Sequence, residues 1–249
     1  MFVLGCDRAY FFAHPERELT ADELARYGGL VAQRASGIPA QYITGHQEFW
    51  GLDFIVTPAV LIPRPETEHL IETVLPLMRR ADRPRIVDVG TGSGCIAIVL
   101  AKELAEAQIL AVDISAPALE IARANAARHQ VEERIDFQQG DLLGGFEAAS
   151  LDFVVSNPPY VGESEEGQVQ LEVRKFEPRN AVFAGHTGLD IIERLAPQAA
   201  AGLKPGGWLA MEISGTIVDG VKTVLRNWDR VQITNDLQGI PRVITARRC

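Results

Sequence analysis

Strand-like and helical segments alternate over most of this 249-residue chain, from about residue 85 to its end. The strand-like runs are short and rich in β-branched residues, as buried strands are. They span 85–89, 108–112, 135–138, 151–156, 208–213, 231–234 and 242–246, and helices are predicted over 67–80, 93–106, 116–129, 189–203 and 217–228. Alternation of this kind is typical of a parallel sheet that is covered by helices on both faces. We therefore expect an α/β fold.

The first part of the chain has a different pattern. Thr20 and Glu23 have the spacing of a capping box, which predicts an amphipathic helix to about Ser36. Aromatic residues on both sides of Gly51 predict a β-hairpin within 47–56. We therefore expect a small helical N-terminal domain, a β-hairpin linker and one large α/β domain. Their predicted bounds are 1–37, 38–66 and 67–249.

Two loops stand out from the regular pattern. The stretch 161–188 mixes acidic and basic residues without a clear periodicity, and we predict an irregular loop there. A loop of this length inside a compact domain is usually functional or mobile. Pro63, Arg64 and Pro65 precede the helix predicted at 67–80, and we expect them to form a rim over a pocket, although proline near a helix start is also ordinary.

The overall charge limits the partners that the chain can have. The formal net charge is −9, with 33 acidic against 24 basic residues. Affinity for nucleic acids depends largely on Lys and Arg contacts to phosphates, so we expect no stable nucleic-acid binding and favour a protein partner. The three cysteines are scattered, which indicates a reducing compartment, the cytoplasm, without a metal cluster. No apolar run is long enough to span a membrane, and we expect a monomer with no membrane contact.

A glycine-rich loop follows the first predicted strand of the sheet. Its residues are Asp88, Val89, Gly90, Thr91, Gly92, Ser93 and Gly94. Glycines at this position permit a tight turn and a close approach of the backbone to a ligand. Asp113, at the end of the next strand, can accept hydrogen bonds from two ribose hydroxyls. Together the loop and Asp113 predict a site for a cofactor that contains a nucleoside.

The spacing of the glycines indicates which cofactor this is. G-x-G-x-G differs from the G-x-G-x-x-G of dinucleotide sites, and no lysine follows it as in nucleoside triphosphate loops. Asp88 would favour a cationic group over a pyrophosphate. S-adenosyl-L-methionine, which has a ribose and an ammonium group, therefore fits better than NAD. We expect Asp141 and Leu142, after the third strand, to lie beside the adenine, with a solvated turn acid and ordinary packing as the simpler interpretations.

Asn157, Pro158, Pro159 and Tyr160 follow the fourth predicted strand directly. The two prolines stiffen this loop, because neither has an N–H group and each restricts the residue before it. A planar NH2 group could donate its protons to the Asn157 side-chain oxygen and the Pro158 carbonyl, while Tyr160 packs against its plane. Taken alone, the motif could equally be a proline-rich turn. The glycine loop, Asp113 and this motif on successive strands are a much stronger signal than any one of them.

These motifs resemble those of a known class of enzymes. DVGTGSG, Asp113, GDL and SNPPY resemble the class I S-adenosylmethionine-dependent methyltransferases. More narrowly, YITGHQEFWGLDF, LIPRPETE, VRKFEPRNAVFAG and GIPRVITARR resemble the HemK/PrmC-type protein-(glutamine-N5) methyltransferases, from about residue 4 to the end. The resemblance implies a Rossmann-like catalytic domain with seven strands, the last one antiparallel, after a helical domain that recognises the substrate. That N-terminal domain is shorter here than is usual for the family, so we expect it to be truncated.

The resemblance also implies an activity. These enzymes transfer a methyl group from S-adenosyl-L-methionine to the glutamine of the Gly-Gly-Gln motif in peptide-chain release factors, and leave S-adenosyl-L-homocysteine. Asn157, Pro158 and Tyr160 would then be catalytic, and the four residues from Asn157 to Tyr160 would bind the glutamine amide. The cofactor would be held by Asp88, Gly90, Thr91, Gly92, Ser93, Gly94, Asp113, Asp141, Leu142 and Asn157.

Two alternatives to this activity stay open. The same loop could act on adenine N6 in DNA or guanine N2 in ribosomal RNA, with the base flipped out of its helix. The chain could also be a scaffold that binds S-adenosylmethionine and has lost catalysis.

Overall fold

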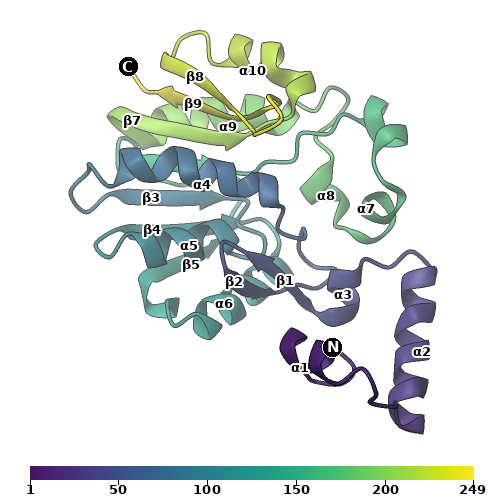
Figure 1. Cartoon of the computed structure of the whole chain (residues 1–249). Coiled ribbons are helices and arrows are strands. Elements are labelled where there is room, and N and C mark those ends of the chain that lie inside the picture. The colour runs from purple at the N-terminus through teal and green to yellow at the C-terminus, as the bar shows by residue number, and fades with distance from the viewer.

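A seven-stranded sheet forms the centre of the larger part of the molecule, in a computed structural model that describes all 249 residues (Figure 1). The strands are β3 (Arg85–Val89), β4 (Gln108–Asp113), β5 (Ile135–Gln139), β6 (Leu151–Ser156), β7 (Leu203–Glu212), β8 (Asp229–Asn235) and β9 (Pro241–Arg247). Their order is β5-β4-β3-β6-β7-β9-β8, and only β9 runs antiparallel to its neighbours. The predicted α/β fold with an antiparallel last strand is therefore confirmed.

The strand order determines where a ligand can bind. The chain passes from β3 outward to β4 and β5, then returns to the other side of β3 with β6. The connections after β3 and β6 therefore leave in different directions. In open α/β sheets, a crevice forms outside the carboxyl ends of the strands at such a point. The glycine loop follows β3 and the Asn157–Tyr160 motif follows β6, so both lie at this crevice.

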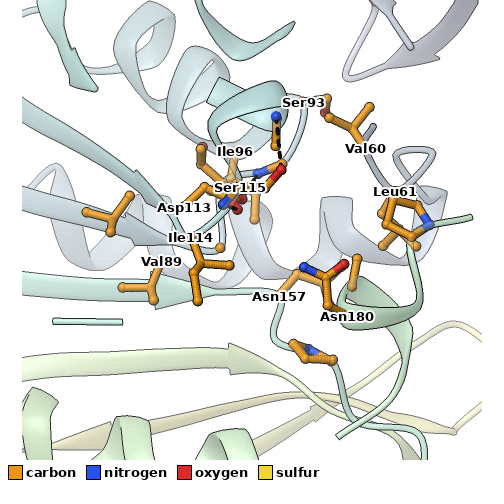
Figure 2. A pocket seen from close by; sticks show the side chains of 18 of the residues that line it. Val60, Leu61, Val89, Ser93, Ile96, Asp113, Ile114, Ser115, Asn157 and Asn180 are labelled. Carbon is orange, nitrogen blue, oxygen red and sulfur yellow. Dashed lines mark hydrogen bonds between the residues drawn. The ribbon is translucent and has the colours of Figure 1, made fainter. Parts of the chain in front are cut away.

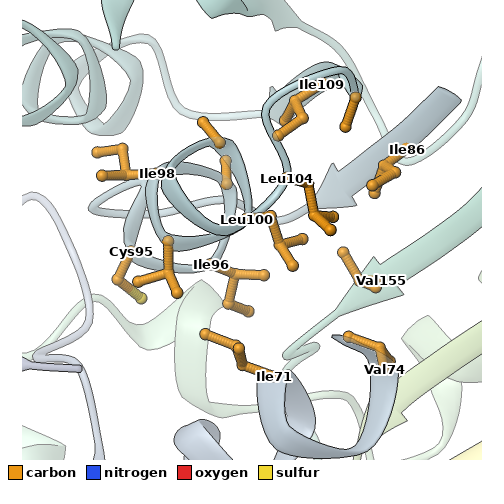
Figure 3. Close-up of a cluster of buried hydrophobic side chains, with 14 of the residues drawn as sticks. Ile71, Val74, Ile86, Cys95, Ile96, Ile98, Leu100, Leu104, Ile109 and Val155 are labelled. Atoms are coloured by element: carbon orange, nitrogen blue, oxygen red, sulfur yellow. The ribbon is translucent and has the colours of Figure 1, made fainter. Parts of the chain in front are cut away.

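Helices cover both faces of the sheet and form two hydrophobic clusters. One face is covered by α4 (Pro65–Met78), α5 (Cys95–Glu103) and α6 (Ala116–Arg128), and the other by α9 (Asp190–Gly202) and α10 (Val218–Val224). Successive side chains of a strand point to opposite faces, so Ile86 of β3 belongs to the first cluster and Val87 to the second. Figure 3 shows how Ile71 and Val74 of α4 face α5 in the first cluster. Both faces of the parallel strands are thus buried, as predicted.

The N-terminal part contains three helices and the predicted hairpin. The elements are α1 (Arg8–Ala13), α2 (Ala21–Ala35), α3 (Ala40–Thr44), β1 (His46–Phe49) and β2 (Leu52–Ile55). The capping box at the start of α2 is present, with Glu23 N donating to Thr20 Oγ1 at 3.2 Å and Thr20 N donating to the Glu23 carboxylate at 2.9 Å. No residue of α2 is buried, and Figure 1 shows this helix set apart from the sheet.

The hairpin is attached firmly to the larger domain. Asn125 of α6 is fully buried, and its side chain accepts a hydrogen bond from Ile55 N at 2.7 Å and donates one to Ile55 O at 3.0 Å. The same Nδ2 atom also donates to Ser93 O in the glycine loop at 2.9 Å. One asparagine therefore connects β2, α6 and the glycine loop.

The structure corrects several expectations about secondary structure. The stretch 161–188 is not irregular throughout, because it contains a 3-10 helix, η2 (Glu163–Gln168), and two short helices, α7 (Leu171–Phe176) and α8 (Arg179–Val182). Each helix is too short to give a clear helical period in the sequence. Residues 204–207, which lie between the predicted helix 189–203 and the predicted strand 208–213, belong to β7. The pairing of β7 with β6 shifts register between Leu151 and Phe153.

Two predicted helices are shorter than expected. α5 begins at Cys95 because Gly94 adopts a left-handed conformation, and α10 is only seven residues long after a 3-10 turn, η3 (Gly215–Ile217). The short helix α3 was not predicted. No helix has both the length and the apolar character that crossing a bilayer requires.

Candidate active site

A cavity of about 250 Å³ opens at the carboxyl ends of β3, β4 and β6. Its walls contain most of the residues that the sequence predicted for a cofactor. They are Gly90, Thr91, Gly92, Ser93, Asp113, Asp141, Leu142 and Asn157, together with Pro159. Figure 2 shows Asp113 and Ser115 on one side of this cavity, with Asn157 and Asn180 on another. The strand order therefore brings together motifs that lie up to about seventy residues apart.

Backbone hydrogen bonds hold the glycine loop against the end of β4. Gly90 N and Thr91 N both donate to Val112 O, at 2.8 and 3.0 Å. Gly90, Gly92 and Gly94 have φ angles of +73°, +56° and +81°, which favour glycine over residues with a side chain. A Cβ atom on Gly94 would lie 3.1 Å from Ala122 Cβ and Ile98 Cδ1. The third glycine thus allows α5 and α6 to pack closely behind the loop.

Both oxygens of Asp113 are oriented by backbone N–H groups. Oδ2 accepts from Gly92 N at 2.9 Å and Oδ1 accepts from Ser115 N at 2.9 Å. Each carboxylate oxygen can accept a further hydrogen bond. A carboxylate that is held in this way at the cavity wall can bind two neighbouring hydroxyl groups, as a ribose presents them.

Asp88 lies behind the glycine loop rather than on the wall of the cavity. It is fully buried, and its Oδ2 accepts from Thr91 Oγ1 at 2.6 Å and from Ala97 N at 3.2 Å. Its Oδ1 atom has no protein partner. Burial raises the pKa of Asp88 to about 7, and the charge of Asp113 adds to this effect. Asp88 therefore joins the loop to the start of α5, and its Oδ1 atom is an unused acceptor behind the loop.

The turn after β5 forms a rim of the cavity. Asp141 is about half exposed and forms an ion pair with Arg194 of α9, which also lines the cavity. Leu142 has a φ angle of +56° and lines the same wall. The turn therefore offers one carboxylate and one apolar side chain to a flat ligand group.

Asn157 lies where the cofactor cavity meets a second hollow of about 150 Å³. The second hollow is lined by Pro158, Pro159 and Tyr160 of the same motif and by Val169 and Val173 from the segment 161–188. Asn157, Pro159, Leu61, Arg64 and Ala181 line both spaces. Ser156 Oγ donates to Val89 O at 2.7 Å and so ties the start of the motif to the end of β3. A group bound in the second hollow would thus lie next to a ligand in the first.

The sequence did not indicate two polar residues behind Asn157. The Asn157 Nδ2 atom donates to Thr67 Oγ1 at 3.0 Å, and the Thr67 hydroxyl donates to Glu212 Oε2 at 2.6 Å. Tyr160 donates its hydroxyl to Glu212 Oε1 at 3.0 Å. A glutamate at the end of the apolar strand β7 was the available signal, because an acid at the carboxyl edge of a buried strand needs partners. Pro63 and Arg64 line the cavity as expected, whereas Pro65 is the first residue of α4.

Comparison with known families agrees with this geometry. Residues 67–175 match the Methyltransferase small domain family, and residues 1–45 match the PrmC N-terminal domain family. The fold and the site therefore define a methyltransferase of the Rossmann-like class that uses S-adenosylmethionine.

The chain is 58% identical to a release factor glutamine methyltransferase of Koribacter versatilis, over all of this chain and 88% of the relative. It is 45% identical to the enzyme of the same name from Nitratidesulfovibrio vulgaris, over 99% of this chain and 85% of the relative. The chain belongs to the release factor glutamine methyltransferase family.

Solved structures support the fold independently. The catalytic domain of hMettl16, solved with an RNA hairpin, superposes with a TM-score of 0.63 at 20% identity, over 83% of this chain and 79% of that one. A ribosomal protein L11 methylase from Lactobacillus delbrueckii superposes with a TM-score of 0.53 at 20% identity, over 75% and 81%. At these identities the likeness shows the methyltransferase fold alone.

Proposed function

We propose that this enzyme transfers the methyl group of S-adenosylmethionine to the side-chain amide nitrogen, N5, of the glutamine in the Gly-Gly-Gln motif of peptide-chain release factors. The observation that carries the proposal is the position of Asn157 at the junction of the two hollows, with its NH2 group already engaged by Thr67. The Asn157 oxygen is then left to accept from a substrate. Family membership and the names of the relatives support the same substrate.

The residues of the larger cavity suit the cofactor. Asp113 would bind the ribose hydroxyls, the backbone of Gly90 to Gly94 would approach the amino-acid part, and Asp141 and Leu142 would flank the adenine. The orphaned Oδ1 atom of Asp88 supports a polar ligand group near the loop. When it is bound, S-adenosylmethionine supplies a methyl group that its sulfonium has already activated.

The main contribution of the protein to catalysis would be to align the glutamine amide with the methyl group of the cofactor. An amide nitrogen is a poor nucleophile because its lone pair is shared with the carbonyl group. Asn157 Oδ1 and the Pro158 carbonyl would accept the two N–H groups of the glutamine amide and direct its lone pair toward the cofactor cavity. Positive charge would grow on the nitrogen as the new bond forms and S-adenosylhomocysteine leaves, so both oxygens would interact more strongly in the transition state. The nitrogen would then release one of its protons to water. Tyr160 would pack against the amide plane, and Pro159 would stiffen the loop.

The N-terminal part offers a surface for a protein substrate. Tyr10, Phe11, Phe12, Leu24 and Tyr27 are exposed, and residues from Met1 to Thr44 line an apolar concavity of about 810 Å³. We assign residues 1–37 to substrate recognition, 38–66 to the linker and 67–249 to catalysis. The enzyme acts as a cytoplasmic monomer without stable nucleic-acid binding, in keeping with its net charge of −9.

The test is methyl transfer from labelled S-adenosylmethionine to a purified release factor, beside a variant of that factor whose Gly-Gly-Gln motif ends in alanine. Label in the first and none in the second is the expected result. Label in neither, with cofactor binding shown by calorimetry, would contradict the proposal. A panel of DNA and RNA substrates would then distinguish a base methyltransferase from an inactive scaffold.

A further inference from the structure

Glu212 and Thr67 form a buried polar pair next to Asn157, with Thr67 on the wall of the cofactor cavity and Glu212 on the wall of the second hollow. Each has only 1% of its surface exposed, and neither belongs to the glycine loop or to the Asn157–Tyr160 motif. Thr67 lies in the first turn of α4 and Glu212 at the end of β7, so two elements outside the motif meet at its first residue. The contacts run from Asn157 through Thr67 to Glu212, at 3.0 and 2.6 Å.

In its ionised form, Glu212 determines the direction of these hydrogen bonds. An ionised carboxylate can only accept, so the single proton of the Thr67 hydroxyl must point toward Glu212. The Thr67 oxygen then has only lone pairs to offer to Asn157. Of the two ends of the Asn157 amide, only the NH2 group can donate to it. The ionised glutamate therefore decides which end of the amide faces Thr67 and which end faces the substrate hollow.

We propose that Thr67 and Glu212 are positioning residues for methyl transfer, which hold the Asn157 amide with its oxygen toward the substrate NH2 group. The proposal rests on the proposed function, because it concerns how Asn157 meets the glutamine amide. With the amide turned over, the NH2 group of Asn157 would face the NH2 group of the substrate. Two donors would then oppose each other where the transition state needs an acceptor.

Tyr160 donates a hydrogen bond to the second oxygen of Glu212 and so keeps the carboxylate from rotating. Its hydroxyl donates to Oε1 at 3.0 Å, while Thr67 occupies Oε2. Burial and the charge of Glu212 both raise the pKa of Tyr160, so its hydroxyl stays a donor throughout the working pH range. The carboxylate is thus held by one donor on each oxygen.

Protonation of Glu212 would disturb this arrangement. A proton on Oε2 would donate to the Thr67 oxygen, the Thr67 proton would turn toward Asn157, and the amide would have to turn over. Burial raises the pKa of Glu212 above its ordinary value, against the lowering effect of Thr67 and Tyr160. Among the charged groups around it, Glu66 of α4 raises this pKa further and Arg242 of β9 lowers it. Turnover should therefore decline toward acidic pH at a higher pH than an ordinary glutamate would cause.

The chain supplies a matched control on the same helix. Thr73 of α4 donates its hydroxyl to His69 O at 2.7 Å, within its own helix and without contact to the site. Thr73→Val and Thr67→Val remove the same atom from the same helix. A loss caused only by replacing a threonine hydroxyl with a methyl group in α4 would appear in both variants.

The experiment compares single-turnover rates of the wild type, Thr67→Val, Thr67→Ser and Thr73→Val with a saturating release factor and cofactor. We expect Thr67→Val to lower the single-turnover rate about 10- to 100-fold, while the KM from separate steady-state rates and the calorimetric cofactor Kd stay within about twofold. Thr67→Ser, which keeps the hydroxyl, should restore most of the rate, and Thr73→Val should match the wild type. Equal rates for Thr67→Val and Thr73→Val would overturn the proposal. If the wild type methylates no release factor, the proposed function fails first, and this inference fails with it.

Two further measurements separate positioning from a purely structural role. Glu212→Gln should lower the rate and abolish the acidic decline of the rate, because a glutamine side chain does not titrate there. An unchanged acidic decline in that variant would contradict the role of Glu212. In the protein without cofactor, the NMR signals of the Asn157 side-chain NH2 group should show a hydrogen-bonded proton in the wild type and in Thr67→Ser but not in Thr67→Val. Identical Asn157 signals in all variants would overturn the proposal without reference to activity.

Discussion

Arg64 and Glu177 form an ion pair beside the active-site cavity, although 113 positions separate them in the sequence. Only 1% of the Glu177 side chain is exposed, and its second oxygen accepts from Ile62 N at 3.2 Å. This carboxylate therefore joins the loop before α4 to the segment that carries α7 and α8. Both pieces line the hollow next to Asn157.

Glu177→Ala should loosen this junction. It removes the partner of a buried backbone N–H and of Arg64, so we expect a loss of about 1–3 kcal/mol in the free energy of unfolding. Urea unfolding measures this loss. Glu166→Ala is the matched control in the same segment, because its ion pair with Arg179 is exposed and should contribute little. Equal unfolding midpoints for the two variants would show that the Glu177 contacts do not stabilise the fold.

Asn157→Ala should reduce turnover far more than cofactor binding. It removes one of the two oxygens that would interact more strongly with the amide in the transition state, and such groups contribute about 10²-fold or more to the rate. Single-turnover rates and calorimetric cofactor affinity are the two measurements. Asn235→Ala, an exposed asparagine at the end of β8, serves as the control. A near-normal rate in Asn157→Ala would exclude Asn157 from the mechanism.

Asp113→Ala should weaken cofactor binding about 10- to 100-fold, because hydrogen bonds to a charged acceptor are among the stronger ones. The variant also frees Gly92 N and Ser115 N, which the carboxylate now holds. Calorimetric titration with S-adenosylhomocysteine measures the change. Asp136→Ala, on the exposed side of β5, should bind like the wild type. Equal affinity in the two variants would argue against a ribose site at Asp113.

Asp88 should make stability depend on pH. Its pKa is raised from the ordinary 3.8 to about 7, with burial as the main cause. Between these values the folded protein binds more protons than the unfolded chain, so the free energy of unfolding should fall as pH rises from about 4 to about 7. Asp88→Asn keeps an oxygen for Thr91 and Ala97 and should flatten this decline.

Urea unfolding at several pH values measures the Asp88 effect in the protein without cofactor. Asp82→Asn, at an exposed position before β3, is the control and should keep the wild-type slope. The same slope in Asp88→Asn would mean that another group causes the pH dependence.

Much of the fold could be predicted because its signals are local. The strand β3 was predicted with its observed bounds, and the capping box at Thr20 marked the start of α2, since both patterns lie within a few neighbouring residues. The helices of the segment 161–188 were not predicted, because they have only four to six residues and are held by distant partners such as Ile62. The extension of β7 to Leu203 was missed for a similar reason, since pairing with β6 overrides the turn residues at 204–207.

The sequence by itself determined the class of site. The glycine loop, Asp113 and the Asn157–Tyr160 motif each combine residue types that the backbone or a ligand requires, and each follows a strand of a parallel sheet. Only the tertiary structure decided what stands behind Asn157. Thr67 and Glu212 are 145 positions apart, and neither stands out from its neighbours in the sequence. They meet because α4 crosses the sheet beside β7, and a buried carboxylate is stable there only with the donors that this crossing brings to it.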